Sequence, residues 1–357
     1  MNKKRRLNIL FSTTRQWNPG DEFILMGCIN LLKPYISFNP VIYNRNPQIR
    51  YLIGWKRKFL NKLFLFIFRI PLFSPFVDNS VKPHTNGDWI DLVVFAGSPA
   101  WYGPPSFDLY QFIQKFKLPV IYLGIGVGEK VNYQSLKQYE QKVLASAHLI
   151  TIRDQMGKSL LSSLKPTFKP CPALFSAPRT KQVEKVENIG LIFATHHGSS
   201  DNKIDKKTSK FLVHLFKILI NENPSVKFQL VCHYIDELEI AYSLFPNLEI
   251  LYSYDSNDYL SIYNKFDLVI GSRVHGLGIS ASLGIPGVMI SHDIRSETVK
   301  GFLSTTIENT TMPTKAVEII NENIKNISFL SQKLTEHKEK TREEYGILLK
   351  PIFEKIE

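Results

Sequence analysis

Short apolar runs alternate along this chain with longer segments in which apolar residues recur at helical spacing. In the first half, the pattern predicts strands over residues 7–12, 41–43, 91–96, 119–125 and 149–152 and helices over 20–32, 107–116, 133–147 and 156–164. In the second half, it predicts strands over 189–194, 226–232, 248–251, 268–270 and 284–290 and helices over 209–220, 237–244, 258–263, 277–283 and 314–324. Strands that alternate with helices favour parallel sheets, so the expected fold class is α/β with two doubly wound domains.

A charged stretch over residues 179–187 interrupts this alternation, and we place the domain boundary there. The predicted domains cover residues 1–180 and 186–325, followed by a charged C-terminal helix over 326–357. Two such domains facing across a cleft form a common kind of ligand site.

The formal net charge of +12 indicates anionic partners, such as phosphorylated metabolites or lipid headgroups. The sequence contains no recognisable nucleic-acid-binding motif, so we expect no nucleic-acid partner. The alternative is a diffuse basic surface without a specific partner.

Cysteine usage and the start of the chain bear on location. Cys28, Cys171 and Cys232 are far apart and odd in number, which argues against a disulfide framework and against a metal site. The apolar run over residues 7–12 is too short for a signal peptide. We therefore expect a cytoplasmic protein.

An apolar, basic insertion at about residues 52–80 interrupts the first predicted domain. Its Phe-rich core over residues 59–77 contains lysine, arginine and proline, and it falls short of the roughly 18 uninterrupted apolar residues of a spanning helix. With Trp55 and basic flanks, residues 55–77 would suit a segment that lies on a membrane surface. The alternative is a buried helix packed on the domain.

The strongest chemical signal is the turn that follows the predicted strand 268–270. Its sequence runs Gly-Ser-Arg-Val-His-Gly, with Ser272, Arg273 and His275 placed between a strand and a helix. In an open α/β sheet, ligands bind at this edge. Arg273 can bind a carboxylate or phosphate through two parallel hydrogen bonds, and His275 can move a proton near neutral pH. This pairing indicates an enzyme that acts on an anionic substrate.

Other strand ends carry candidate binding residues. After the first strand come Asn18, Gly20 and Asp21, where glycine permits close approach of a ligand and the helix start offers free N–H groups to an anion. The alternative is an ordinary helix cap. Gly97 and Gly126 follow two later strands, and glycine-rich turns of this kind indicate that the backbone approaches something closely.

Two further arginines could contribute positive charge. Arg153 follows the strand 149–152, with a pair to Asp154 as the alternative, and Arg295 follows the strand that ends at about residue 290, with a solvated surface position as the alternative. Adjacent His196 and His197 lack a carboxylate at metal-ligand spacing, so we expect no metal.

Taken together, these motifs resemble the polysaccharide pyruvyl transferase family over roughly residues 8 to 300. The resemblance is carried by Asn18-x-Gly20-Asp21, the glycine turns, Arg153-Asp154, and Ser272-Arg273-x-His275-Gly276 followed by Ala281-x-x-Gly284-Ile285-Pro286.

The resemblance implies two Rossmann-like domains in a glycosyltransferase-B-like arrangement. It also implies transfer of the pyruvyl group of phosphoenolpyruvate onto two hydroxyls of a sugar in polysaccharide biosynthesis, with no cofactor. His275 would be the base and Arg153 would stabilise the donor, while Arg273, Ser272 and Arg295 would bind it. A lipid-linked acceptor would place the enzyme at the inner membrane face. Three alternatives stay open: a nucleotide-sugar-dependent glycosyltransferase, a non-catalytic module that binds glycans or membranes, and pyruvyl or related transfer onto an acceptor that is not a polysaccharide.

Overall fold

The computed structural model describes residues 5–14, 18–44, 87–97, 104–126, 133–197 and 204–356. The predicted insertion at 52–80 and the predicted membrane-docking segment 55–77 lie outside these residues. In the described part of the chain, no helix is both long and apolar enough to cross a membrane.

The N-terminal domain is built on a six-stranded parallel sheet in the order β2-β1-β3-β4-β5-β6. Every residue of β3 and β4 is buried, as expected for central strands of a parallel sheet with both faces covered. The strands are β1 (Leu7–Thr13), β2 (Phe38–Asn44), β3 (Leu92–Ala96), β4 (Val120–Ile125), β5 (Leu149–Ile152) and β6 (Thr167–Phe168). The helices are α1 (Pro19–Leu32), α3 (Pro104–Phe116), α4 (Gln138–Ala145) and α5 (Gln155–Leu160).

The C-terminal domain has a second parallel sheet of six strands, in the order β12-β11-β10-β7-β8-β9. Its strands are β7 (Asn188–Ile192), β8 (Lys227–Val231), β9 (Glu249–Leu251), β10 (Leu268–Gly271), β11 (Gly287–Ser291) and β12 (Thr305–Glu308). Its helices are α6 (Lys206–Glu222), α7 (Leu238–Leu244), α8 (Asp258–Tyr263), α9 (Val274–Ser282) and α10 (Pro313–Lys325). The predicted α/β class with two Rossmann-like domains is confirmed.

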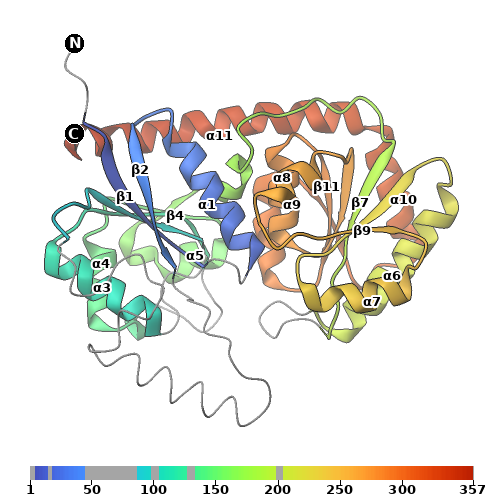
Figure 1. Ribbon diagram of the computed structural model, residues 1–357, viewed down its shortest axis with the longest axis horizontal. Helices are drawn as coiled ribbons and strands as arrows, with labels where there is room; N and C mark the ends of the chain where they lie inside the picture. Colours follow the sequence, from blue (N-terminus) through green and yellow to red (C-terminus); the bar gives the residue numbers. More distant parts are fainter. Residues whose placement is uncertain are drawn as a thin grey trace, which may run out of the picture.

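One hydrophobic core extends through both domains. It runs from β1 and α1, through the 3-10 turn Pro172–Phe175, to α9 and the strands of the second sheet. A second, smaller core covers the other face of the N-terminal sheet. Helices α1 and α9 lie side by side where the two domains meet (Figure 1).

Two edge strands differ from the sequence-based expectation. The proline-rich segment 166–178, expected to be irregular, contains the two-residue strand β6, and β12 follows the 3-10 helix Ile294–Phe302. Both are short and partly exposed, so they lack the continuous apolar run that marks the buried strands.

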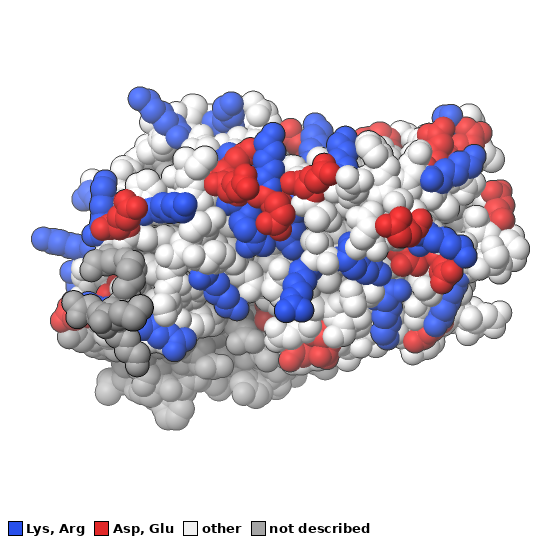
Figure 2. All heavy atoms as spheres, turned by 90° about the horizontal axis from the view of Figure 1, so that it is seen from above, with Lys and Arg blue, Asp and Glu red and all other residues white. Residues whose placement is uncertain are grey.

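The long helix α11 (Ile327–Ile356) runs along both domains (Figure 1). On the N-terminal side, Tyr35 Oη donates to the carbonyl of Arg342 at 3.0 Å, and Lys169 pairs with Glu344 at 2.6 Å. On the face that α11 lines, Lys and Arg side chains are interspersed with Asp and Glu (Figure 2).

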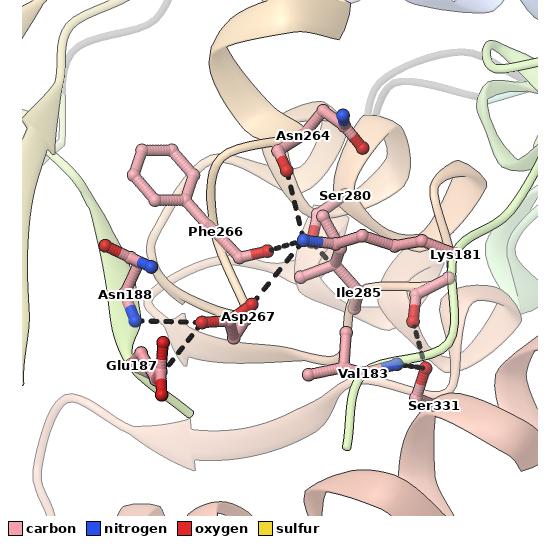
Figure 3. A network of polar contacts seen from close by, with 11 residues as sticks. Lys181, Val183, Glu187, Asn188, Asn264, Phe266, Asp267, Ser280, Ile285 and Ser331 are labelled. Atoms are coloured by element: carbon pink, nitrogen blue, oxygen red, sulfur yellow. Dashed lines mark hydrogen bonds and ion pairs between the residues drawn. The ribbon is translucent and has the colours of Figure 1, made fainter. Parts of the chain in front are cut away.

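The segment that joins the domains is bonded to the C-terminal domain. Lys181 Nζ donates to the carbonyl of Phe266 at 2.6 Å and lies 3.5 Å from Asp267, whose other oxygen accepts from the backbone N–H of Asn188 (Figure 3). Ser331 of α11 accepts from the N–H of Val183 at 3.0 Å (Figure 3). These contacts hold the joining segment at the amino ends of β7 and β10.

Candidate functional site

The starts of α1 and α9 meet between the two domains. Asn18 caps α1, with its Oδ1 accepting from the N–H of Gly20 at 3.0 Å, and Arg273 is the first residue flanking α9. Gly20 lies so close to Nδ1 of His275 that a Cβ atom there would overlap the imidazole. Helix N-termini carry partial positive charge, so this meeting point favours an anion.

Arg153 and His275 join the two domains directly. Arg153 Nη1 lies 3.1 Å from His275 Nε2, and because a guanidinium only donates, Nε2 accepts and its lone pair points at Arg153. Arg153 follows β5 and is only 7% exposed. Gly126, after β4, leaves room for its guanidinium, since a Cβ there would lie 2.8 Å from Nη2. The structure therefore brings together four of the predicted residues: Gly20, Gly126, Arg153 and His275.

The environment of His275 keeps its imidazole neutral. Burial, and the nearby charges of Arg153 and Arg295 together with His233, hold the pKa of His275 well below its usual range. At pH 7 the ring is therefore a proton acceptor rather than a donor.

Arg273 is already paired within the C-terminal domain. Its Nη2 donates to Glu237 Oε1, and its guanidinium stacks on the ring of Tyr234, 4.7 Å from the centroid. Burial has the largest single effect and lowers the pKa of Arg273, but Glu237, Tyr234 and Asp236 together raise it by more, so the guanidinium stays charged. The predicted anion-binding arginine thus has a carboxylate as neighbour, which the sequence alone did not indicate.

The other predicted residues lie after the carboxyl ends of β3, β10 and β11 or in the first turn of α1. Asp21 is buried in the first turn of α1 and accepts from the hydroxyl of Thr14. Ser272 is buried and its hydroxyl makes no hydrogen bond to the described residues. Gly97 directly follows β3 and has a φ of +93°, a conformation that favours glycine. Arg295 is 52% exposed and donates to Asp293 at 2.9 Å, so it is not an isolated cation.

Sequence analysis missed Glu237, Tyr234 and the buried pair formed by His233 and Tyr263. His233 Nε2 lies 2.9 Å from Tyr263 Oη, and burial together with Arg273 lowers the pKa of His233 to about 3. His233 and Tyr234 follow β8, so the strand-end rule that identified Arg153 and Arg273 would have found them, whereas Glu237 lies further along, in the 3-10 helix Ile235–Glu237.

No group of three or more His, Cys, Asp or Glu side chains that could hold a metal ion occurs in the described ranges. The three cysteines are free and buried. Burial raises the pKa of Cys171, whose Sγ lies 3.7 Å from Arg153 Nη1.

Comparisons with known proteins identify the family of this chain. The family model described as polysaccharide pyruvyl transferase matches residues 18–294, a span that holds all of the site residues named above except Thr14 and Arg295. No curated protein matches the sequence.

Several solved structures share the fold at low identity. A UDP-N-acetylglucosamine 2-epimerase from Listeria monocytogenes, assigned as putative, is 12% identical with a TM-score of 0.55, over 92% of this chain and 91% of that one. The UDP-GlcNAc 2-epimerase from Neisseria meningitidis, bound to UDP-GlcNAc, is 12% identical with a TM-score of 0.54, over 92% and 94%. At this identity the likeness concerns the fold alone.

Proposed function

Because the chain belongs to the polysaccharide pyruvyl transferase family, we propose that it transfers the pyruvyl group of phosphoenolpyruvate to two hydroxyls of one sugar. The products are a pyruvate ketal and inorganic phosphate. The observation that carries this proposal is the contact between Arg153 and His275, because it places a fixed cation and a neutral imidazole together at the meeting point of two helix starts.

Phosphoenolpyruvate carries a carboxylate and a phosphate, so its site needs several cations and N–H donors. In the proposal, Arg153 and Arg273 bind these groups with Ser272, and the charge of Arg295 adds to the field. Asn18, Gly20 and Asp21 line the α1 side, where Asp21 is suited to accept from a sugar hydroxyl. Gly97 and Gly126 let the backbone approach the substrates at the ends of β3 and β4.

The reaction can be followed proton by proton. The first sugar hydroxyl attacks C2 of the donor and loses its proton to Nε2 of His275, which Arg153 releases as its guanidinium turns to the donor. C3 gains a proton from solvent and becomes a methyl group, and His275 afterwards returns its proton to solvent. Phosphate then leaves C2 as its C–O bond breaks. The second hydroxyl attacks the same carbon and its proton leaves with phosphate or solvent. Arg153 stabilises the charge that develops at C2 and on the leaving group.

No electrons change hands in this sequence, so the proposal requires no redox cofactor. A lipid-linked acceptor, a cytoplasmic location and membrane contact through residues 55–77 stay predictions from the sequence.

Ligand-induced thermal stabilisation tests the choice of donor. A ligand at about 100 times its Kd adds roughly 2.7 kcal/mol, which is easily seen as a rise in Tm. We expect phosphoenolpyruvate to raise the Tm of the wild type but not that of Arg273→Ala, and a nucleotide-sugar to have no effect. A shift with a nucleotide-sugar alone would instead make the protein a glycosyltransferase, and no shift with either would favour a non-catalytic module.

Substitution of His275 tests the base. His275→Gln removes the proton acceptor and keeps a polar side chain of similar size, so phosphate release in the presence of acceptor should fall by more than about tenfold. The Tm shift with phosphoenolpyruvate should persist, because binding of the donor relies on the arginines. Near-normal turnover by the variant would contradict the assignment.

A further inference from the structure

Glu237 is a buried carboxylate that the proposed reaction does not use. It is 0% exposed, and its Oε2 accepts from the backbone N–H groups of His233 at 2.9 Å and Tyr234 at 3.1 Å. Its Oε1 accepts from Arg273. A buried ion pair seldom adds stability over well-packed apolar residues, so this arrangement indicates a role in orienting Arg273.

Tyr234 restrains the same guanidinium from a second direction and also reaches the other domain. Its ring lies under Arg273, and its Oη lies 3.1 Å from Oδ1 of Asn18. Oδ1 of Asn18 also accepts from the N–H of Gly20 and so caps α1. The hydroxyl of Tyr234 therefore donates to the side chain that caps this helix. An unbroken series of contacts therefore runs from Glu237 in the C-terminal domain to Gly20 in the N-terminal domain.

This series ends at His275. Gly20 packs against its Nδ1 and Arg153 lies against its Nε2, and both of these neighbours belong to the N-terminal domain. The charged and titratable groups that act on the imidazole are Arg153 from the end of β5, Arg295 after β11 and His233 after β8. If the start of α1 moves away from the C-terminal domain, the imidazole loses its contact with Gly20 and becomes accessible to water.

We infer that Glu237 and Tyr234 are positioning residues of this site. Glu237 fixes the orientation of the Arg273 guanidinium, and Tyr234 ties that guanidinium through Asn18 to the start of α1. The N-terminal domain is thereby held against His275 before any substrate binds. The kinetic part of this inference rests on the proposed function, whereas its structural part does not.

Two conservative variants break the link between the domains from opposite sides. Tyr234→Phe removes the hydroxyl but leaves the ring under Arg273. Asn18→Ser keeps a good helix cap but is too short to meet Tyr234. A matched control is Tyr35→Phe, which removes a partly buried phenol hydroxyl that donates to the carbonyl of Arg342, far from the site.

The primary readout is the titration of the His275 imidazole, followed by NMR in the unliganded full-length protein with labelled histidine. The His275 signal is identified by its loss in His275→Gln. In both Tyr234→Phe and Asn18→Ser, we expect the pKa of His275 to rise by about one unit, because burial and Arg153 then depress it less. The double variant should shift no further than either single one, since both break the same bond. Tyr35→Phe should titrate as the wild type does.

Kinetics with phosphoenolpyruvate provide the second readout. Tyr234→Phe should lower kcat about tenfold with KM for the donor changed less than about twofold, because the domains are misaligned while Arg273 stays in place. Glu237→Gln should instead raise the donor KM by about tenfold, because the guanidinium loses its orientation.

Unchanged titration of His275 in Tyr234→Phe and Asn18→Ser would overturn the inference, as would equal shifts in the Tyr35→Phe control. If the wild type shows no turnover and no Tm shift with phosphoenolpyruvate, the proposed function fails, but the NMR titrations still decide the positioning role.

Discussion

Both ring nitrogens of His275 face the opposite domain, Nδ1 toward Gly20 and Nε2 toward Arg153. The imidazole is consequently held in one orientation by groups that it meets only when the two domains are together. Its depressed pKa keeps it ready to accept a proton over the whole neutral range. A group of this kind loses its function only under acidic conditions.

The acid limb of the pH profile should report on the charges around His275. Since the base works when neutral, activity falls as pH drops through its pKa, and a higher pKa moves that loss to higher pH. Arg295→Gln removes one of the charges that lower this pKa. We expect the acid limb of kcat/KM to move upward in this variant, and high salt to move it in the same direction in the wild type. An acid limb that stays at the same pH in both experiments would contradict the assignment of Arg295 as a charge that lowers the pKa of His275.

Gly20 offers a steric test of the same contact. Gly20→Ala places a methyl group where the His275 imidazole lies, so the ring must leave its position. We expect kcat to fall by more than about tenfold, because the imidazole then no longer occupies the position from which it accepts the proton. A fully active Gly20→Ala enzyme would show that His275 does not need this position.

The sequence identified candidate site residues by their position directly after a predicted strand. Arg153, Arg273 and His275 were found in this way, and the structure brings Arg153 and His275 into contact. The partner of Arg273 was missed because Glu237 reads as the start of a helix, and because a contact between residues 36 positions apart leaves no local pattern. The pairing of Arg295 with Asp293, by contrast, was within reach of the sequence, since the two are neighbours.

Among the elements, α11 and α9 are joined by a buried lysine. Lys338 of α11 is 1% exposed and donates to the carbonyls of Ala177 at 2.9 Å and Ser282 at 2.7 Å. Because Ser282 is the last residue of α9, the ammonium group lies at the negative end of that helix. Burial, together with the charge of Arg342, lowers the pKa of Lys338 to about 8.

The stability of the protein should depend on pH through this lysine. Its pKa is lower in the folded than in the unfolded chain, so between about pH 8 and 10.5 the unfolded state binds more protons and folding gains stability as pH rises. We expect the unfolding free energy of the wild type, relative to Lys338→Met, to rise by up to about 3 kcal/mol across this window. Urea unfolding of both proteins at the two pH values measures it, and a constant difference would contradict the depressed pKa.

The elements themselves were predictable where their apolar pattern was strong. The helix predicted over 258–263 has the same bounds as α8. The predicted central strands also agree with the structure, because burial on both faces of a sheet demands continuous apolar runs. The helix predicted over 133–147 is shorter, α4 (Gln138–Ala145) preceded by a 3-10 turn, because Ser135 and Lys137 do not continue the helical pattern. Strand β12, with three of its four residues at least partly exposed, gave no signal.

Over the whole molecule, two parallel sheets were predictable from the alternation of strands and helices, whereas their joint packing was not. The shared core passes through the Pro172–Phe175 turn, in a segment whose prolines indicated only irregular structure. On the face that α11 lines, basic and acidic side chains are mixed, so the net positive charge forms no single patch there (Figure 2).

Helix α11 has a consequence for how the protein melts. It is bonded near its start to the segment that joins the domains, and near its end it buries Tyr345 and Leu349 in the core with the N-terminal domain. Neither domain can lose its structure without uncovering apolar surface of the other, so heat should unfold the chain in one cooperative step. Calorimetry should accordingly give a single peak whose calorimetric and van 't Hoff enthalpies agree.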